Sequence, residues 1–263
     1  MSKILAVDIG NTHTKFAEIT DDSYEYLGYV PTSIVATGEP GEPGEQRRGL
    51  FTSKKAKDAT PRDDFSGCII SSVVPSKTQD VVEMIKRNFG IAPEFVPDDR
   101  GVGADLLASM EYAGKHFELP CCVFSLGTAT TMYVLGENGQ IQGGVICPGI
   151  EPSLEGLAVK AENLTYITPY ETDTFLEFTT NGAMNSGIIY GTAGQVKELY
   201  KKVLEIIDIK TLVLAGGYSE LISKYVEIPH VLERDIVLKG CYELYIKDIK
   251  PENKKISMYG LLL

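Results

Sequence analysis

The sequence has no tryptophan, only three histidines, and fewer basic than acidic residues. Lys and Arg number 25 against 36 Asp and Glu, which gives a formal net charge of -11 at pH 7. Neutralising nucleic-acid phosphates requires clustered Lys and Arg, so this balance argues against nucleic acid as a partner. An anionic small molecule would need backbone N–H groups, a helix N-terminus or a divalent metal to bind it.

Metal-type cysteine spacing and long apolar runs are also missing. The five cysteines are Cys68, Cys121, Cys122, Cys147 and Cys241. They form no CxxC pair and mostly lie in apolar runs, so we predict buried, reduced thiols and a cytoplasmic protein. No apolar run reaches the ~18 residues of a membrane span. Only a few apolar residues precede Asp8, and we expect neither a signal peptide nor a membrane segment.

The two halves of the chain repeat one plan. Strand-like runs occupy 4–7, 14–19 and 24–30 in the first half and 121–126, 131–135 and 140–146 in the second. No helical pattern separates the runs within a set, so each set predicts an antiparallel start to a sheet. Further strands and helices alternate after each set, which indicates an α/β class. We predict two lobes, at residues 1–118 and 119–263.

Several helices and one irregular segment complete the expected organisation. Helices are expected after Ser76, near Asp105, and at 153–163, 183–207 and 235–247. Ser76 and Gln79 form a capping-box pattern ahead of apolar residues that share one helical face. Residues 37–64 are rich in Gly, Pro and charged residues, and we expect an exposed excursion there.

A polar turn follows the first strand and contains Asp8, Gly10, Asn11 and Thr12. Gly10 would let the backbone approach a phosphate, Asn11 and Thr12 offer donors, and Asp8 offers a carboxylate for hydrated Mg²⁺. The alternative is an ordinary hairpin turn. Ser125 and Gly127 repeat the polar residue and the glycine two places later, which predicts an internal duplication.

Other glycine- and threonine-rich stretches allow two explanations each. Residues 125–131 would wrap a transferring phosphoryl group, or form a Thr-rich turn. Ala215-Gly216-Gly217 would let a purine lie against the backbone, or would make a strand-to-helix turn. Gly187, Gly191 and Gly194 share one helix face, where core packing or a subunit interface would explain them.

Together these motifs resemble the type III pantothenate kinases over nearly the whole chain. The matching segments are 8–12, 71–75, 103–105, 127–131, 143–149, 183–187, 190–195 and 214–217. The resemblance implies the fold of the acetate and sugar kinase, Hsp70 and actin superfamily. Its two duplicated ribonuclease H-like lobes each hold a mixed five-stranded sheet flanked by helices. A homodimer is also implied.

The resemblance implies ATP-dependent phosphorylation of the primary hydroxyl of pantothenate, the first step of coenzyme A biosynthesis. Mg²⁺ and a monovalent cation, K⁺ or NH₄⁺, would be required. By motif match Asp105 would accept the hydroxyl proton, and Asp8 would organise Mg²⁺, with Ser125 at a second metal position. The residues implied around ATP are Gly10, Asn11, Thr12, Lys15, Gly127, Thr128, Thr130, Gly216 and Gly217. Those implied around the acceptor are Gly103, Ala104, Asp105, Gly143, Gly144, Pro148, Gly149 and Thr180.

The chain departs from the family pattern at a few of these motifs. Ser125 replaces an Asp, Met132-Tyr133 stands where an Asp is common, and Leu106 replaces an Arg expected near the acceptor carboxylate or phosphate. Arg100 is a candidate substitute for that Arg. The departures leave two alternatives open, a kinase for another small alcohol and a catalytically weak nucleotide-binding regulator.

Overall fold

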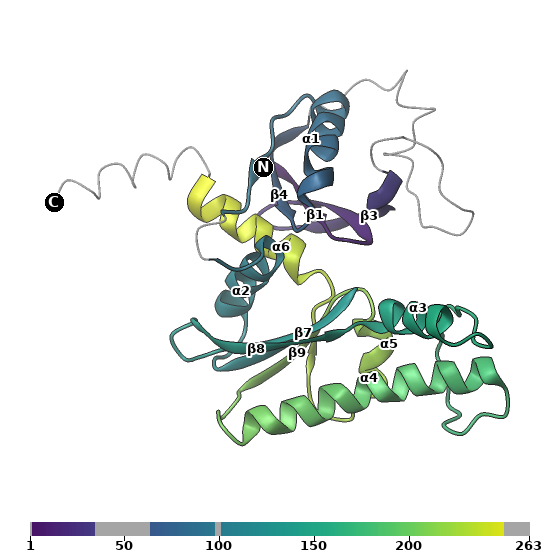
Figure 1. The fold of residues 1–263 in the computed structure, drawn as a ribbon. Coiled ribbons are helices and arrows are strands. Elements are labelled where there is room, and N and C mark those ends of the chain that lie inside the picture. Colours follow the sequence, from purple (N-terminus) through teal and green to yellow (C-terminus); the bar gives the residue numbers. More distant parts are fainter. Residues whose placement is uncertain (1, 35–63, 98–100, 250–263) are drawn as a thin grey trace. The chain divides into compact units, whose positions relative to one another are not determined.

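The computed structural model describes residues 2–34, 64–97 and 101–249. The chain divides into two compact units (Figure 1). The first unit comprises Met1–Tyr112 and Val237–Leu263, and the second comprises Ala113–Ile236. The division predicted at 118/119 differs from this grouping, because the final helix contributes its apolar residues to the core of the first unit.

The first unit contains a mixed sheet of five strands in the order β3-β2-β1-β4-β5. The strands are β1 (Lys3–Ile9), β2 (His13–Ile19), β3 (Tyr24–Pro31), β4 (Phe65–Ser72) and β5 (Glu94–Phe95). Strand β1 pairs antiparallel with β2 and parallel with β4. The predicted antiparallel start is confirmed. Strand β5 was not predicted, since two residues carry no periodicity.

The second unit repeats this sheet in the order β10-β9-β6-β7-β8. Its strands are β6 (Cys121–Leu126), β7 (Ala129–Leu135), β8 (Ile141–Pro148), β9 (Thr211–Ala215) and β10 (Val231–Leu232). Strand β6 takes the place of β1, antiparallel to β7 and parallel to β9. The predicted duplication and the predicted fold class are therefore confirmed.

Helix α1 (Pro75–Phe89) covers one face of the first sheet. The predicted apolar stripe of this helix is confirmed, with Val81, Ile85 and Phe89 buried. The predicted capping box is wrong. Val74 is the N-cap, and its apolar side chain makes no cap hydrogen bond. Pro75 occupies the first turn, where its missing N–H costs nothing.

Helices α2 (Ala104–His116) and α6 (Ile236–Leu244) contribute to the core on the opposite face, and α6 continues into a π-helical turn at Tyr245–Ile249. A Cβ at Gly240 would collide with the backbone of Ala108. The glycine thus lets the two helices approach closely. Leu238, Cys241 and Leu244 of α6 pack with Ile4 and other residues of the first sheet.

Three helices belong to the second unit: α3 (Ile150–Lys160), α4 (Thr180–Leu204) and α5 (Ser219–Ser223). Helices α3 and α4 both begin three residues earlier than predicted. The Thr179 hydroxyl accepts a hydrogen bond from the Gly182 N–H and caps α4, and this cap lies upstream of the apolar periodicity. Within the described ranges, no helix has the length and apolar character needed to cross a membrane.

The glycine stripe of α4 is open. A Cβ at Gly187, Gly191 or Gly194 would meet nothing within 4 Å in the described part of the chain. Core packing within this chain therefore does not explain the stripe, and the subunit-interface explanation stays.

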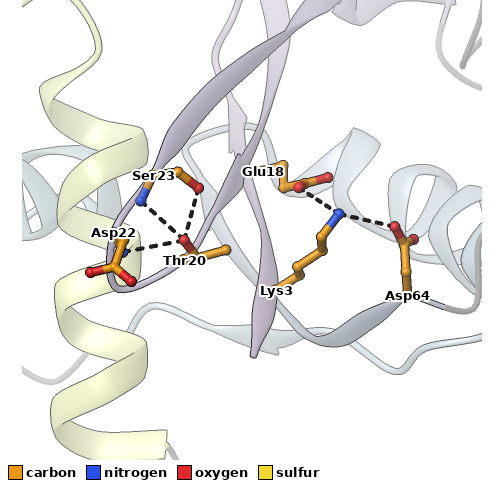
Figure 2. Close-up of polar contacts among 6 residues, drawn as sticks. All are labelled: Lys3, Glu18, Thr20, Asp22, Ser23 and Asp64. Carbon is orange, nitrogen blue, oxygen red and sulfur yellow. Dashed lines mark hydrogen bonds and ion pairs between the residues drawn. The ribbon is translucent and has the colours of Figure 1, made fainter. Parts of the chain in front are cut away.

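Polar contacts of Lys3 and Thr20 lie at one end of the first sheet (Figure 2). Lys3 Nζ lies 2.8 Å from Glu18 Oε1 and 3.2 Å from Asp64 Oδ2, so it links β2 and the start of β4. These two carboxylates raise the pKa of Lys3. The Thr20 hydroxyl accepts the Ser23 N–H at 3.0 Å in the turn that follows β2. The register shifts between Lys3 and Ile4, and beyond this irregularity the two strands pair so that Asp8 lies opposite Ser71.

A short helical turn (η1, Thr32–Ile34) follows β3. Most of the predicted excursion at 37–64 lies outside the described residues.

Candidate active site

The carboxyl end of β1 presents Asp8 beside a tight turn. Asp8 is 7% exposed, and its Oδ2 lies 3.8 Å from Lys15 Nζ on the neighbouring strand. The Gly10 N–H donates to the His13 carbonyl at 3.1 Å. A Cβ on Gly10 would lie 3.1 Å from that same oxygen, so glycine keeps the turn tight. The hairpin geometry and the phosphate-binding interpretation are compatible at this turn.

Thr32, which the sequence analysis did not single out, fixes the turn from behind. Its hydroxyl donates to the Gly10 carbonyl at 2.7 Å, and its N–H donates to the Thr12 carbonyl at 2.9 Å. Thr32 is 2% exposed, whereas Asn11 is exposed. The contact joins positions 22 residues apart, so no local sequence pattern could have shown it.

Asp105 lies in the first turn of α2, where the helix dipole favours a carboxylate. Its Oδ1 accepts the Leu106 N–H at 2.7 Å. A Cβ at Gly103 would come within 2.7 Å of that oxygen, so the glycine provides room for the carboxylate. The side chain is partly exposed and remains available to a ligand.

Asp8 shares one face of the first sheet with Ile4 and Ala6, which pack with Cys241 and with α2, the helix that carries Asp105. The thiol of Cys241 is fully buried, and burial is the main reason its pKa is raised. The negative charges of Asp8 and Asp105 raise that pKa further, while a backbone hydrogen bond from Ser71 lowers it. The two carboxylates implied for catalysis therefore share one face of the first sheet. Cys241 itself carried no signal in the sequence beyond its apolar surroundings.

In the second unit, the Gly127 turn contacts the start of α3. The Gly127 N–H donates to the Ala129 carbonyl at 3.1 Å, and the Gly149 N–H donates to the Thr128 carbonyl at 3.1 Å. A Cβ at Gly149 would collide with the carbonyl oxygens of Gly127 and Thr128. The structure thus brings one residue implied for the acceptor against two implied for the phosphates.

The glycine pair after β9 packs against the end of β6. Gly216 has φ +90, and a Cβ there would lie 2.7 Å from the backbone N and O of Leu126. The Tyr218 N–H donates to the Leu126 carbonyl at 3.0 Å. Since α5 begins at Ser219, the predicted strand-to-helix turn is present and accounts for Gly216. Gly217 is exposed beside it.

Comparison with known proteins settles the family. The family model described as type III pantothenate kinase matches residues 4–202. A type III pantothenate kinase of Paramagnetospirillum magneticum is 31% identical, over 94% of this chain and 98% of the relative. One from Halalkalibacterium halodurans is 30% identical, over 94% of this chain and 100% of the relative.

The chain belongs to the type III pantothenate kinase family. Solved structures support the fold alone. A Baf family protein from Campylobacter jejuni has a TM-score of 0.54 at 16% identity, covering 93% of this chain and 98% of that one. An archaeal actin homolog has a TM-score of 0.51 at 15% identity, covering 94% and 100%.

The residues of the first unit suit a Mg²⁺ ion that arrives bound to a nucleotide better than a metal ion held by protein side chains alone. The described residues contain no group of three or more His, Cys, Asp or Glu side chains placed to hold a metal. Mg²⁺ that acts on nucleotides is typically held by only one or two carboxylates plus the phosphates. Asp8 offers such a carboxylate, with glycine turns that allow phosphate to approach the backbone. The residues present therefore fit Mg²⁺ delivered with a nucleotide.

The remaining residues that the family resemblance implies for the site differ in solvent exposure. Thr128 is exposed, but Thr130 is 2% exposed within β7, so only the former presents its hydroxyl to a ligand without rearrangement. Gly143, Gly144 and Pro148 lie exposed along β8. Thr180 is exposed in the first turn of α4.

The departures from the family have different structural settings. Ser125 is half-buried at the end of β6, with Ala215 as its partner on β9. Tyr133 is 2% exposed, so its ring belongs to the core of the second unit. Leu106 is partly exposed next to Asp105. Arg100, the candidate substitute for the missing Arg, lies outside the described residues.

Proposed function

We propose that this protein transfers the γ-phosphoryl group of ATP to the primary hydroxyl of pantothenate. The product would be 4'-phosphopantothenate, formed in the first step of coenzyme A biosynthesis. Membership of the type III pantothenate kinase family supports the assignment. The observation that carries it is that Asp8 and the helix that carries Asp105 lie on one face of the first sheet.

Asp105 would act as the general base. It lies in the first turn of α2, and Gly103 leaves the carboxylate free of side-chain crowding. A partly exposed carboxylate in this position is able to accept the proton of an acceptor hydroxyl as that oxygen attacks phosphorus.

Asp8 would hold Mg²⁺ together with the ATP phosphates. When bound, Mg²⁺ neutralises negative charge on the β- and γ-phosphates. Lys15, whose ammonium group lies 3.8 Å from Asp8 Oδ2, would orient that carboxylate or contact a phosphate oxygen. Because glycine has no side chain, the turns at Gly10 and Gly127 would let the phosphates come close to the backbone.

A monovalent cation, K⁺ or NH₄⁺, would also take part, as the family resemblance implies. Ser125 offers a neutral hydroxyl where the family has a carboxylate, so we expect a weaker dependence on this cation. Omitting K⁺ and NH₄⁺ from the assay measures that dependence directly.

We place the reaction in a homodimer in the cytoplasm. The open glycine stripe of α4 and the exposed apolar side chains of the second unit both support a subunit interface. Residues that are more than three-fifths exposed include Ile146, Val159, Phe175, Leu176, Phe178 and Ile206. All five cysteines are free, and burial raises the pKa of Cys121 to about 11 and of Cys122 to about 12, as suits unreactive thiols in a reducing compartment.

A second candidate function is the phosphorylation of another small alcohol. The partly exposed Leu106 beside Asp105 favours it, since an apolar side chain there offers no partner for an acceptor carboxylate. The same carboxylates would perform the chemistry, so only the acceptor differs.

The test is ATP turnover by the purified protein with Mg²⁺ and K⁺, with pantothenate, with other small alcohols, and without acceptor. We expect pantothenate-dependent turnover that Asp105→Asn lowers by about 10²- to 10⁴-fold, the range typical of a lost general base. Nucleotide binding by the variant checks that it is folded. Turnover with a different alcohol would favour the second candidate, and nucleotide binding without any turnover would contradict both.

A further inference from the structure

Ser71 carries a buried hydroxyl with no evident structural use. The residue lies in β4 and is fully buried, and its Oγ has no hydrogen-bond partner among the described residues. A buried hydroxyl that makes no hydrogen bond costs free energy, and such groups are uncommon in folded proteins. A serine here therefore requires a reason other than packing.

The position of Ser71 points to the candidate site. Asp8 and Ser71 are partners in the parallel β1–β4 register, so their side chains project from the same face of the sheet. Paired strands lie about 4.8 Å apart, and Ser71 Oγ makes no direct hydrogen bond to Asp8, so a single bridging water fits between the two side chains. The backbone of Ser71 also contacts Cys241 of α6, the helix that packs on this face of the sheet.

The duplicated sheet provides an internal control. In the second unit the corresponding pair is Ser125 on β6 and Ala215 on β9. Ala215 is fully buried, as Ser71 is, so this position of the fold accepts a side chain without a hydroxyl. The hydroxyl occurs in the unit whose first strand ends in a carboxylate.

Ser72 shows what a structural serine looks like at the same place. Its Oγ lies 2.7 Å from Thr78 Oγ1 and accepts the Val74 N–H at 3.2 Å, so it secures the start of α1. Successive strand residues project to opposite faces, which places Ser72 away from Asp8. The two serines thus form a matched pair, one engaged and one not.

We propose that Ser71 is a positioning residue for Asp8. Its hydroxyl donates a hydrogen bond to a water that the Asp8 carboxylate also binds. This bond holds the carboxylate in the orientation that receives the hydrated Mg²⁺ of an ATP complex. The inference rests on the proposed function and deepens it, since it assigns a role to a residue of the 71–75 motif that the kinase chemistry leaves unused.

The experiment compares Ser71→Ala with Ser72→Ala. Binding of a non-hydrolysable ATP analogue is measured by calorimetry, without acceptor, at several Mg²⁺ concentrations and in EDTA. We expect Ser71→Ala to weaken the Mg²⁺-dependent part of the affinity roughly tenfold, as losing a hydrogen bond to a metal ligand does. Affinity in EDTA should not change. Ser72→Ala should keep the wild-type Mg²⁺ dependence, and Ser71→Thr should restore it by returning the hydroxyl.

Unchanged Mg²⁺ dependence in Ser71→Ala would overturn the proposal, and so would an equal loss of affinity in EDTA, which indicates a structural role. If Ser71→Ala does not fold, Ser71→Cys takes its place, because a thiol of similar size is a poor hydrogen-bond donor. A wild-type protein that binds no nucleotide in a Mg²⁺-dependent manner would overturn the proposed function as well. That outcome appears before any variant is made, so the two failures are distinct.

Discussion

The two units share a strand order but differ in what they place on it. The first unit ends its central strand in Asp8 beside Ser71, and the second ends the equivalent strand in Ser125 beside Ala215. Among the described residues, large exposed apolar side chains belong to the second unit with the one exception of Phe95. The two units thus share a scaffold, whereas the buried carboxylate at the end of the central strand belongs to the first and most of the large exposed apolar side chains belong to the second.

Making the first unit resemble the second should have the largest effect. Asp8→Ser copies the residue at position 125 into the first turn, and we expect turnover to fall by about 10²- to 10³-fold, as when one group that stabilises transition-state charge is lost. Steady-state kinetics at saturating ATP measures it. Ser125→Asp, the reverse exchange, should not lower activity. Equal losses in both variants would show that the two turns are not specialised.

The backbone contact between the Gly127 turn and the start of α3 requires glycine at position 149 but not at position 156. Gly149→Ala places a Cβ against the carbonyl oxygens of Gly127 and Thr128, so we expect a loss of about 1–3 kcal/mol in the free energy of unfolding. Urea denaturation measures the change. Gly156→Ala in the same helix meets nothing within 4 Å and should instead stabilise by about 0.5–1 kcal/mol. Similar effects of both substitutions would contradict the contact.

The exposed apolar surface of the second unit tests association rather than folding or catalysis. Phe178→Ser in the second unit removes apolar area from the proposed interface. Because burial of one such side chain contributes about 1.5–3 kcal/mol, the dissociation constant of the dimer should rise about tenfold or more. Sedimentation velocity over a concentration series measures it. The control is Phe95→Ser, the exposed aromatic of the first unit, which should leave association unchanged. The same shift in both would place the interface elsewhere.

Much of the fold was readable from the sequence because its signals are local. Apolar runs located β1 to β3 and β6 to β8, and the stripe of Val81, Ile85 and Phe89 located α1. The strands β5 and β10 were missed because two residues show no period. The capping box at Ser76 failed because Pro75 starts the helix earlier, and a proline at that position overrides the side-chain cap.

The candidate site was readable only in part, for the same reason. Asp8 and Asp105 were identified from motifs, and their roles remain predictions. Thr32, Ser71 and Cys241 were not assigned roles, because their neighbours near the candidate site are distant from them in the chain. No window of the sequence contains both partners of such a contact.

The sequence alone determined the α/β class, the duplication and the family, since these depend on periodicity and on motifs that keep their order. Only the tertiary structure decided that α6 returns its apolar face to the first unit, that both carboxylates share one face with Cys241, and that Ser71 is buried opposite Asp8. These features arise from strand register and helix packing. Strand register and helix packing both bring together residues that are far apart in the chain. The stability of each such contact therefore depends on neighbours that are not adjacent in the sequence.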